Sequence, residues 1–216
     1  MPRNKYPEET RRKIIEVSKK LFLEKGFEKT TILDIVDGLE GLSRGAFYHH
    51  FKSKDEVMEA VLEDRNIQND PFNYIKGLKN LNGLQKIKQI LVHQMKHSMQ
   101  TTEQKQMVGM AISLLENPRF LAEQVKSNMH VSKLLAPIIQ EGMDDGSIKK
   151  GNPQVLAELF MMTINFWFFP AVYPFDEETA EDKVMTVKQI FDALGMPVLD
   201  EEILGLLESF ANDLQW

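Results

Sequence analysis

Apolar residues recur at intervals of three and four along nearly every long segment of the chain, and no convincing alternating run interrupts them. This spacing places apolar side chains on one stripe of a helix, whereas a half-buried strand requires alternation. In segment 7–25, for example, Ile14, Val17 and Leu21 fall on one stripe. The sequence therefore predicts an all-helical protein, with about nine to ten helices in total.

Size and composition narrow the class of protein. The 216 residues are enough for one large or two small domains with a core of their own. The absence of cysteine excludes a disulfide framework, a thiolate nucleophile and a cysteine-ligated metal. The first residues lack the apolar region of a secretory signal, and segment 155–169 is interrupted by Glu158 and Asn165 and is too short to span a bilayer. We therefore expect a cytoplasmic protein with no membrane partner.

Charge is divided unevenly along the chain. Residues 1–54 carry 12 Lys and Arg against 8 Asp and Glu, whereas residues 55–216 carry 14 against 24. A basic end suits a polyanionic partner, although solvated helix faces alone produce a similar division.

Three short elements follow the first helix. Thr31 and Asp34 form a capping-box pattern that opens a helix to about residue 39, and Ser43 can cap a helix over 44–50. A further capping pattern at Ser53 opens a fourth helix. Two short helices joined by a glycine-containing turn match the helix-turn-helix plan, in which the second short helix enters the major groove of DNA. A three-helix subdomain that does not bind DNA would show the same pattern of helices and turns.

The helix over 44–50 has the chemistry of a DNA-contacting element. Its predicted solvent face carries Arg44, Gly45, Tyr48 and His49. Arginine can contact a guanine edge, and a helix N-terminus with a capping hydroxyl and nearby lysines offers donors to phosphate.

Segment 30–54, TTILDIVDGLEGLSRGAFYHHFKSK, resembles the DNA-binding signature of the tetracycline-repressor (TetR) family of bacterial transcriptional regulators. Segment 21–27, LFLEKGF, resembles the end of that family's first helix. The resemblance covers roughly the first 65 residues, and beyond them only the number and length of helices are similar. It implies a helix-turn-helix domain at 1–65, with a linking helix from about 53, and a helical ligand-binding and dimerisation domain at 66–216.

The resemblance also implies roles for individual residues. Thr31 would cap the second helix against the phosphate backbone, Tyr48 and His50 would touch phosphates, and Lys54 would hold a phosphate and link the two domains. The implied DNA-binding set is Thr31, Ser43, Arg44, Gly45, Ala46, Tyr48, His49, His50, Lys52 and Lys54. Between Asp34 and Ser43 the chain has one residue more than the family's usual spacing, which should lengthen the turn or unwind the end of the second helix.

The family's dimers imply a pairing of segments 153–169 and 178–194 with their symmetry mates in a four-helix bundle. Segment 153–169 is apolar nearly all round and needs partners on more than one side, although a buried core helix of a monomer has the same pattern. The implied interface residues are Leu156, Phe160, Ile164, Phe168, Val184, Val187 and Phe191.

Methionines and aromatic residues lie on helices that, in this family, surround a ligand cavity. Methionine is flexible and polarizable and suits an apolar or aromatic effector, but it also fills cores. The candidate pocket residues are Met95, Met99, Met107, Met110, Phe120, Met129, Phe160, Phe166 and Trp167.

His93 and His97 are four residues apart, a spacing that can bind zinc, but Gln94 follows His93 and no third ligand is evident. We therefore predict no metal and interpret both histidines as polar surface or pocket residues. No nucleophile stands beside a positioned base, so the sequence predicts neither an enzyme nor a cofactor.

Together these features predict a bacterial, nucleoid-associated homodimer that binds a near-palindromic double-stranded operator as a repressor and is released by a small effector. The alternative is a helical small-molecule-binding or interaction protein with weakened DNA binding.

Overall fold

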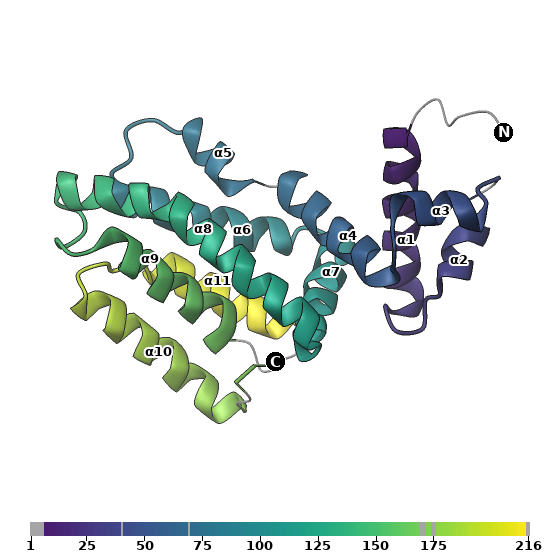
Figure 1. Cartoon of the computed structure of the whole chain (residues 1–216). Coiled ribbons are helices and arrows are strands. Elements are labelled where there is room, and N and C mark those ends of the chain that lie inside the picture. Colours follow the sequence, from purple (N-terminus) through teal and green to yellow (C-terminus); the bar gives the residue numbers. More distant parts are fainter. Residues whose placement is uncertain (1–6, 40, 69, 169–171, 174–175, 215–216) are drawn as a thin grey trace. The chain divides into compact units, whose positions relative to one another are not determined.

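The computed structural model describes residues 7–39, 41–68, 70–168, 172–173 and 176–214, and within them the chain is helical with no strand. The all-helical class is confirmed (Figure 1). The α-helices are α1 (Pro7–Lys25), α2 (Ile32–Asp37), α3 (Arg44–His50), α4 (Lys54–Gln68), α5 (Pro71–Lys76), α6 (Gly83–Ser98), α7 (Thr102–Ser113), α8 (Pro118–Asp145), α9 (Pro153–Met162), α10 (Glu177–Ala193) and α11 (Glu201–Leu214). A 3-10 helix, η1 (Leu114–Glu116), follows α7, and a π-helix, η2 (Thr163–Trp167), follows α9.

The α-helices in the described residues number eleven, more than the sequence predicted. The difference comes from α5, which occupies a segment rich in turn-forming residues. Pro71 begins α5, and proline is well suited to the first helical position because the N–H it lacks would have no partner there. Helix α8 continues without a break through Pro137, although proline inside a helix removes one backbone hydrogen bond.

The chain divides into two compact units, Met1–Asp70 and Pro71–Trp216. In the N-terminal unit, α1 packs against α4 and α2, and α2 packs against α3. Ile14, Ile35, Phe47 and Val57 are completely buried between these helices. One residue from each helix thus meets in a shared core, which fixes the short helices α2 and α3 on the longer ones.

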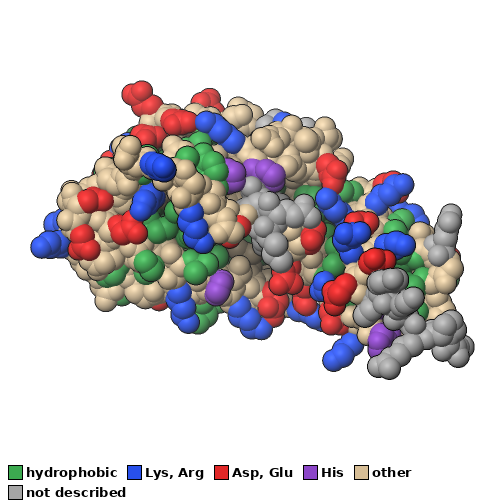
Figure 2. Space-filling model, turned by 90° about the horizontal axis from the view of Figure 1, so that it is seen from above, with side chains coloured by type: hydrophobic (Ala, Val, Ile, Leu, Met, Phe, Trp, Pro, Cys, Tyr) green, Lys and Arg blue, Asp and Glu red, His purple; other side chains and the backbone are tan. Residues whose placement is uncertain are grey.

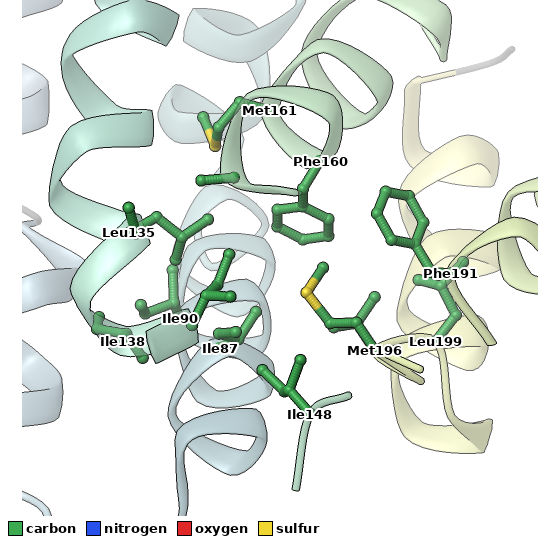
Figure 3. Packing of buried hydrophobic residues seen from close by; sticks show 14 of the residues in the cluster. Ile87, Ile90, Leu135, Ile138, Ile148, Phe160, Met161, Phe191, Met196 and Leu199 are labelled. Atoms are coloured by element: carbon green, nitrogen blue, oxygen red, sulfur yellow. The ribbon is translucent and has the colours of Figure 1, made fainter. Parts of the chain in front are cut away.

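In the C-terminal unit, α8 packs against α9 and α6, and α6 also contacts α5, α7 and α11. Figure 3 shows the hydrophobic cluster where these helices meet. The rings of Phe160 in α9 and Phe191 in α10 meet edge to face, with centroids 5.4 Å apart. Burial of aromatic surface in such pairs is a large stabilising contribution to a helical core.

Backbones approach most closely where α6 begins beside the end of α8. A Cβ atom on Gly83 would lie 2.1 Å from the backbone nitrogen of Gly142. The N–H of Gly83 donates to Oδ2 of Asp145 at 2.8 Å, so the start of α6 is capped by the last residue of α8. Glycine at position 83 is therefore required by packing.

The buried residues correct part of the predicted dimer interface. Phe160, Val187 and Phe191 are no more than 2% exposed and belong to the core of a single chain, so they cannot meet a second copy. Leu156, Ile164 and Phe168 are partly buried and pack against the same core, and Val184 is half-buried. The predicted interface was wrong for Phe160, Val187 and Phe191. An apolar helix also needs a face that packs into the core of its own chain, and these residues lie on that face.

The same burial corrects part of the predicted ligand pocket. Met107, Phe120, Phe160 and Phe166 are buried, and Met129 is 58% exposed. The other candidates, Met95, Met99, Met110 and Trp167, are half-buried. Two surface cavities of about 320 and 280 Å³ lie along α6 and α11, and none of these nine residues lines either one. Phe160 fills the core and Met129 faces solvent, so neither forms a pocket wall in this structure.

Helix 153–169 was predicted as one element, of which Phe169 lies outside the described residues. The observed helix changes from α to π at Thr163. At this change, Nδ2 of the buried Asn128 donates to the Met161 carbonyl, and Nδ2 of Asn165 donates to Oδ1 of Asn128.

No described helix is long and apolar enough to cross a membrane.

Candidate nucleic-acid interface

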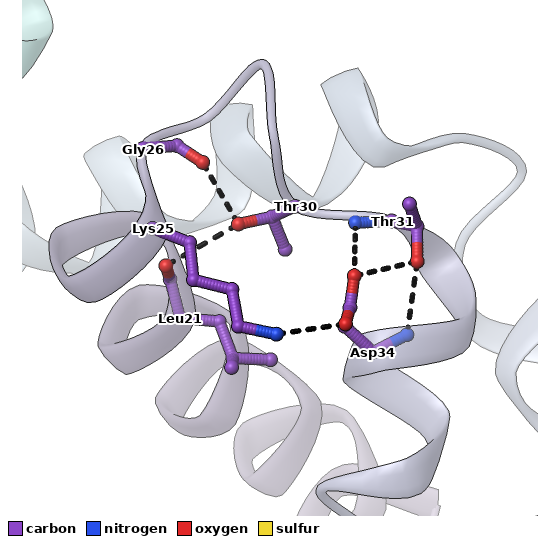
Figure 4. Close-up of polar contacts among 6 residues, drawn as sticks. All are labelled: Leu21, Lys25, Gly26, Thr30, Thr31 and Asp34. Atoms are coloured by element: carbon purple, nitrogen blue, oxygen red, sulfur yellow. Dashed lines mark hydrogen bonds and ion pairs between the residues drawn. The ribbon is translucent and has the colours of Figure 1, made fainter.

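The start of α2 is fixed by a complete capping box (Figure 4). The backbone N–H of Asp34 donates to Oγ1 of Thr31 at 3.1 Å, and the N–H and hydroxyl of Thr31 both donate to Oδ2 of Asp34. Thr31 remains exposed. Two otherwise unsatisfied helix-end donors are therefore paired, as the capping pattern predicted.

A second set of contacts joins α2 to the end of α1. Nζ of Lys25 lies 2.8 Å from Oδ1 of Asp34. These hydrogen bonds, first from Lys25 and then from Thr31, hold the pKa of Asp34 well below its ordinary value. The buried hydroxyl of Thr30 donates to the carbonyls of Leu21, near the end of α1, and of Gly26, directly after it (Figure 4). Together these bonds orient α2 on α1.

The turn between α2 and α3 runs from residue 38 to 43, longer than the three or four residues common in this motif. The helix ends at Asp37, short of the predicted residue 39, and Gly41 adopts a left-handed φ of 80°. Leu39 is buried, and its N–H donates to the Val36 carbonyl. The extra residue is thus accommodated in a longer turn, of which Glu40 lies outside the described residues.

The helix α3 is capped by Ser43, whose Oγ accepts from the backbone N–H of Ala46 at 3.2 Å. Phe47 is completely buried and Phe51, which follows the helix, is 2% exposed. This anchoring leaves one side of the helix to solvent. The exposed residues are Ser43, Arg44, Gly45, Tyr48 and His49, and Ala46 and His50 are half-buried.

Charge and aromatic surface lie together on this exposed side. The guanidinium of Arg44 lies over the Tyr48 ring, 5.8 Å from its centroid. The rings of His49 and His50 meet edge to face, with centroids 5.4 Å apart. Burial, and then the nearby His49, lowers the pKa of His50. The exposed side of α3 therefore presents hydrogen-bond donors that could contact an anion, at positions fixed by the helix.

The two lysines after α3 differ in their contacts. Lys52 is exposed, whereas Lys54 is half-buried. Nζ of Lys54 donates to the carbonyls of Phe27 and Glu28 at 2.6 and 3.2 Å and lies 4.3 Å from the Phe27 ring centroid. The expected phosphate ligand is therefore engaged in joining the start of α4 to the end of α1. A sequence motif specifies that a lysine is present but not where its ammonium points.

Two further residues of the N-terminal unit have notable positions that were not predicted. Leu33 is 60% exposed on α2, the most exposed of the large hydrophobic side chains in the described residues. Leu33 does not lie on the buried side of α2 with Ile35 and Val36. Its position in the helical pattern could therefore have indicated that it is exposed. Arg11 lies over the Phe51 ring at 5.2 Å, and no short-range pattern predicts a contact across forty residues.

The helix-turn-helix segment of this chain is similar to known proteins. Residues 14–61 match the family model "Bacterial regulatory proteins, tetR family". This N-terminal segment of the chain is similar to that family. The description of the matched family names regulatory proteins.

Relatives with known names are similar to this chain over the N-terminal unit. The transcriptional regulator TtgR of Pseudomonas putida is 43% identical over 56 residues, which are 26% of each chain. The match thus spans about a quarter of the length of that relative.

The fold is similar over a longer range. A TetR-family regulator from Pectobacterium atrosepticum has a TM-score of 0.63 at 18% identity, covering 89% of this chain and 97% of that one. SmeT, the repressor of a Stenotrophomonas maltophilia multidrug efflux pump, has a TM-score of 0.58 at 17% identity, covering 87% and 91%. A complex of SmeT with triclosan has also been solved. At these identities the likeness is one of fold.

Proposed function

We propose that this chain is a cytoplasmic, nucleoid-associated repressor of the tetR family that binds a near-palindromic DNA operator as a homodimer and is released by a small molecule. The observation that carries the proposal is the exposed side of α3, which presents Arg44, Tyr48 and His49 while Phe47 anchors the helix. A helix held in this way can enter a major groove with its side chains toward the bases.

We assign the contacts as follows. Arg44 contacts a guanine edge, and the absence of a side chain at Gly45 allows close approach. Tyr48, His49, His50 and Lys52 contact phosphates or adjacent bases, which sets the position of the helix along the groove. Thr31, Ser43 and Ala46 bring helix N-termini to the backbone. We assign Lys54 the role of a positioning residue in place of a phosphate ligand.

The proposed division of labour places DNA binding in residues 1–65, with the linking helix from about 53, and ligand binding and dimerisation in residues 66–216. The unit boundary at Asp70–Pro71 lies close to this division.

Dimerisation needs an apolar surface that a single chain leaves open. Outside the core face, α9 exposes Val155 (58%), Leu159 (41%) and Met162 (52%). Similarly, Met185 and Ile190 of α10 and Leu194, which caps its C-terminus, are 37–42% exposed. We therefore propose that a second copy of the chain packs on these outward faces, which replaces the buried residues in the predicted interface. Exposed apolar stripes of this kind are typical of interfaces.

The experiment that tests DNA binding is selection of the full chain against a random duplex library, followed by anisotropy titration of the selected duplex at several salt concentrations. We expect an enriched palindrome, with affinity falling steeply between about 50 and 200 mM salt because phosphate contacts release counterions. No enrichment together with a flat salt response would contradict the proposal. That result would favour the second candidate, a small-molecule-binding protein with weakened DNA binding, which the long 38–43 turn motivates.

Sedimentation velocity tests the dimer separately. The wild-type chain should sediment as a dimer, and Leu159→Asp should shift it toward monomer because a charge would be buried without a partner. The matched control, Glu158→Asp, changes an exposed neighbour on the same helix. A monomeric wild type at micromolar concentration would contradict this part of the proposal.

A further inference from the structure

A row of roughly parallel rings lies on the surface of the C-terminal unit. Tyr74 of α5 stacks on His93 of α6, with centroids 4.0 Å apart and planes at 11°. His97, one turn further along α6, continues the row at 6.3 Å and 22°. Tyr74 is 38% exposed. The row therefore presents aromatic surface that this chain does not cover.

This row forms one wall of the larger surface cavity, of about 320 Å³. The other walls are Gln89, Val92 and Lys96 of α6, Gln100 in the turn after α6, and Glu202 of α11. In Figure 2, histidine side chains (purple) lie together at the surface of the larger unit. The volume falls at the lower end of the range of small-molecule sites, roughly 300–1,000 Å³, and a few polar groups converge on it.

The charged residues that line the cavity are Lys96 and Glu202. Nζ of Lys96 lies 2.9 Å from Oε1 of Glu202, but both side chains are 55% exposed. A pair this exposed contributes little, so another carboxylate can replace Glu202 beside Lys96. His93 adds a ring N–H donor. The side-chain amide of Gln104 lies 3.1 Å from Nε2 of His97 and holds that ring in orientation.

We propose that this cavity binds a small planar aromatic acid. The ring of the ligand stacks on the row of Tyr74, His93 and His97, since offset stacking of flat rings is favourable. The carboxylate of the ligand pairs with Lys96. The assignment of this ligand as the effector rests on the proposed function, whereas its binding to the cavity does not.

The test uses three probes of one shape and different charge: 2-naphthoate, 2-naphthamide and 2-naphthamidine. The full chain is titrated with each probe by calorimetry, without DNA, and backbone amide shifts locate the site. We expect 2-naphthoate to bind with a Kd on the order of 0.1–1 mM, as a compound of this size allows. We expect it to bind about fivefold or more tightly than the amide, with the amidine weakest.

Variants separate the two parts of the site. Lys96→Gln should abolish the preference for naphthoate over naphthamide and leave the affinity for the amide unchanged. His93→Leu should weaken all three probes about tenfold, since the stacking partner is lost, and Tyr74→Leu should act in the same direction. His130→Leu is the matched control, because His130 is exposed on α8 and does not line the cavity. Thermal unfolding verifies that each variant is folded.

Three results would overturn the proposal: no binding of any probe up to about 10 mM, equal affinity for the three probes, or unchanged affinity in both His93→Leu and Lys96→Gln. Anisotropy with the selected operator is a separate measurement. Loss of operator binding with intact naphthoate binding refutes the repressor function alone. Intact operator binding without naphthoate binding refutes the cavity alone.

Discussion

The two units of the chain are specified in different ways. In the N-terminal unit, individual polar contacts set the geometry, among them the Thr31–Asp34 capping box, the Lys25–Asp34 ion pair and the bonds of Lys54 to the end of α1. In the C-terminal unit, the main feature is a large apolar cluster. Sequence similarity to TtgR reaches 43% but covers only 26% of the chain, whereas fold similarity at 18% identity covers 89%.

This difference has a physical reason. A surface that recognises a ligand through particular donors needs those residue types at those positions. A core needs only suitable volume and pattern, so many apolar sequences build the same packing. Substitutions in the two units should therefore differ in the kind and size of their effects.

The largest effect is expected from Phe191→Ala. Its ring is completely buried against Phe160, so truncation leaves a cavity in the C-terminal core. The free energy of unfolding should fall by about 3–5 kcal/mol, measured by urea denaturation. Gln189→Ala, at an exposed position of the same helix, is the control and should lower it much less. Equal losses would mean that α10 does not have distinct core and surface faces.

The next effect concerns base preference. Arg44→Ala should lower discrimination between the selected operator and a duplex mutated at one guanine by about 1–3 kcal/mol, measured by anisotropy. Tyr48→Ala should instead weaken specific and random duplexes by similar factors, because a phosphate contact carries no sequence information. Unchanged discrimination in Arg44→Ala would remove this residue from base contact.

A smaller effect is expected from Lys54→Met. The substitution removes the bonds to the carbonyls of Phe27 and Glu28 and should lower the stability of the N-terminal unit by about 1–2 kcal/mol. Lys52→Met, at an exposed position, should leave stability unchanged but reduce the salt dependence of DNA binding by about one phosphate contact. If Lys54→Met changed the salt dependence and not stability, its side chain would contact phosphate in the complex.

The smallest effect is a dependence on pH. The pKa of Asp34 is lowered in the folded protein, so its ionised form stabilises the fold above its ordinary pKa, and this stabilisation is lost as the pH falls through the folded pKa. The stability difference between wild type and Asp34→Asn should thus be largest near neutral pH and shrink below about pH 4. Chemical denaturation across this range measures it. Asp37→Asn, at the exposed end of α2, is the control, and a difference independent of pH would contradict the role of the Lys25 and Thr31 bonds.

The helix starts could be predicted from the sequence because they depend on capping residues close by in the chain. The starts of α2 and α3 at Ile32 and Arg44 follow directly from the capping side chains of Thr31 and Ser43. Caps act within one turn, so a sequence pattern contains all the residues involved. The identification of the tetR-family segment rests on the same short range.

The candidate surfaces were predictable only in part. The pattern of Phe47 and Phe51 indicated which side of α3 is anchored, and Leu33 was visible as an apolar residue off the buried stripe. The contact of Arg11 with Phe51, and the row formed by Tyr74 with His93, join residues far apart in the chain. Such contacts depend on how helices pack.

The sequence by itself determined the helical class, most helix starts and the identity of the DNA-binding segment, because periodicity and capping are local properties. Tertiary structure alone decided that Phe160, Val187 and Phe191 face the core, that Lys54 bonds to the end of α1, and that His93 and His97 line a cavity. A helix that is apolar on several sides has more than one possible inward face, and only the packing of its neighbours selects which face is buried.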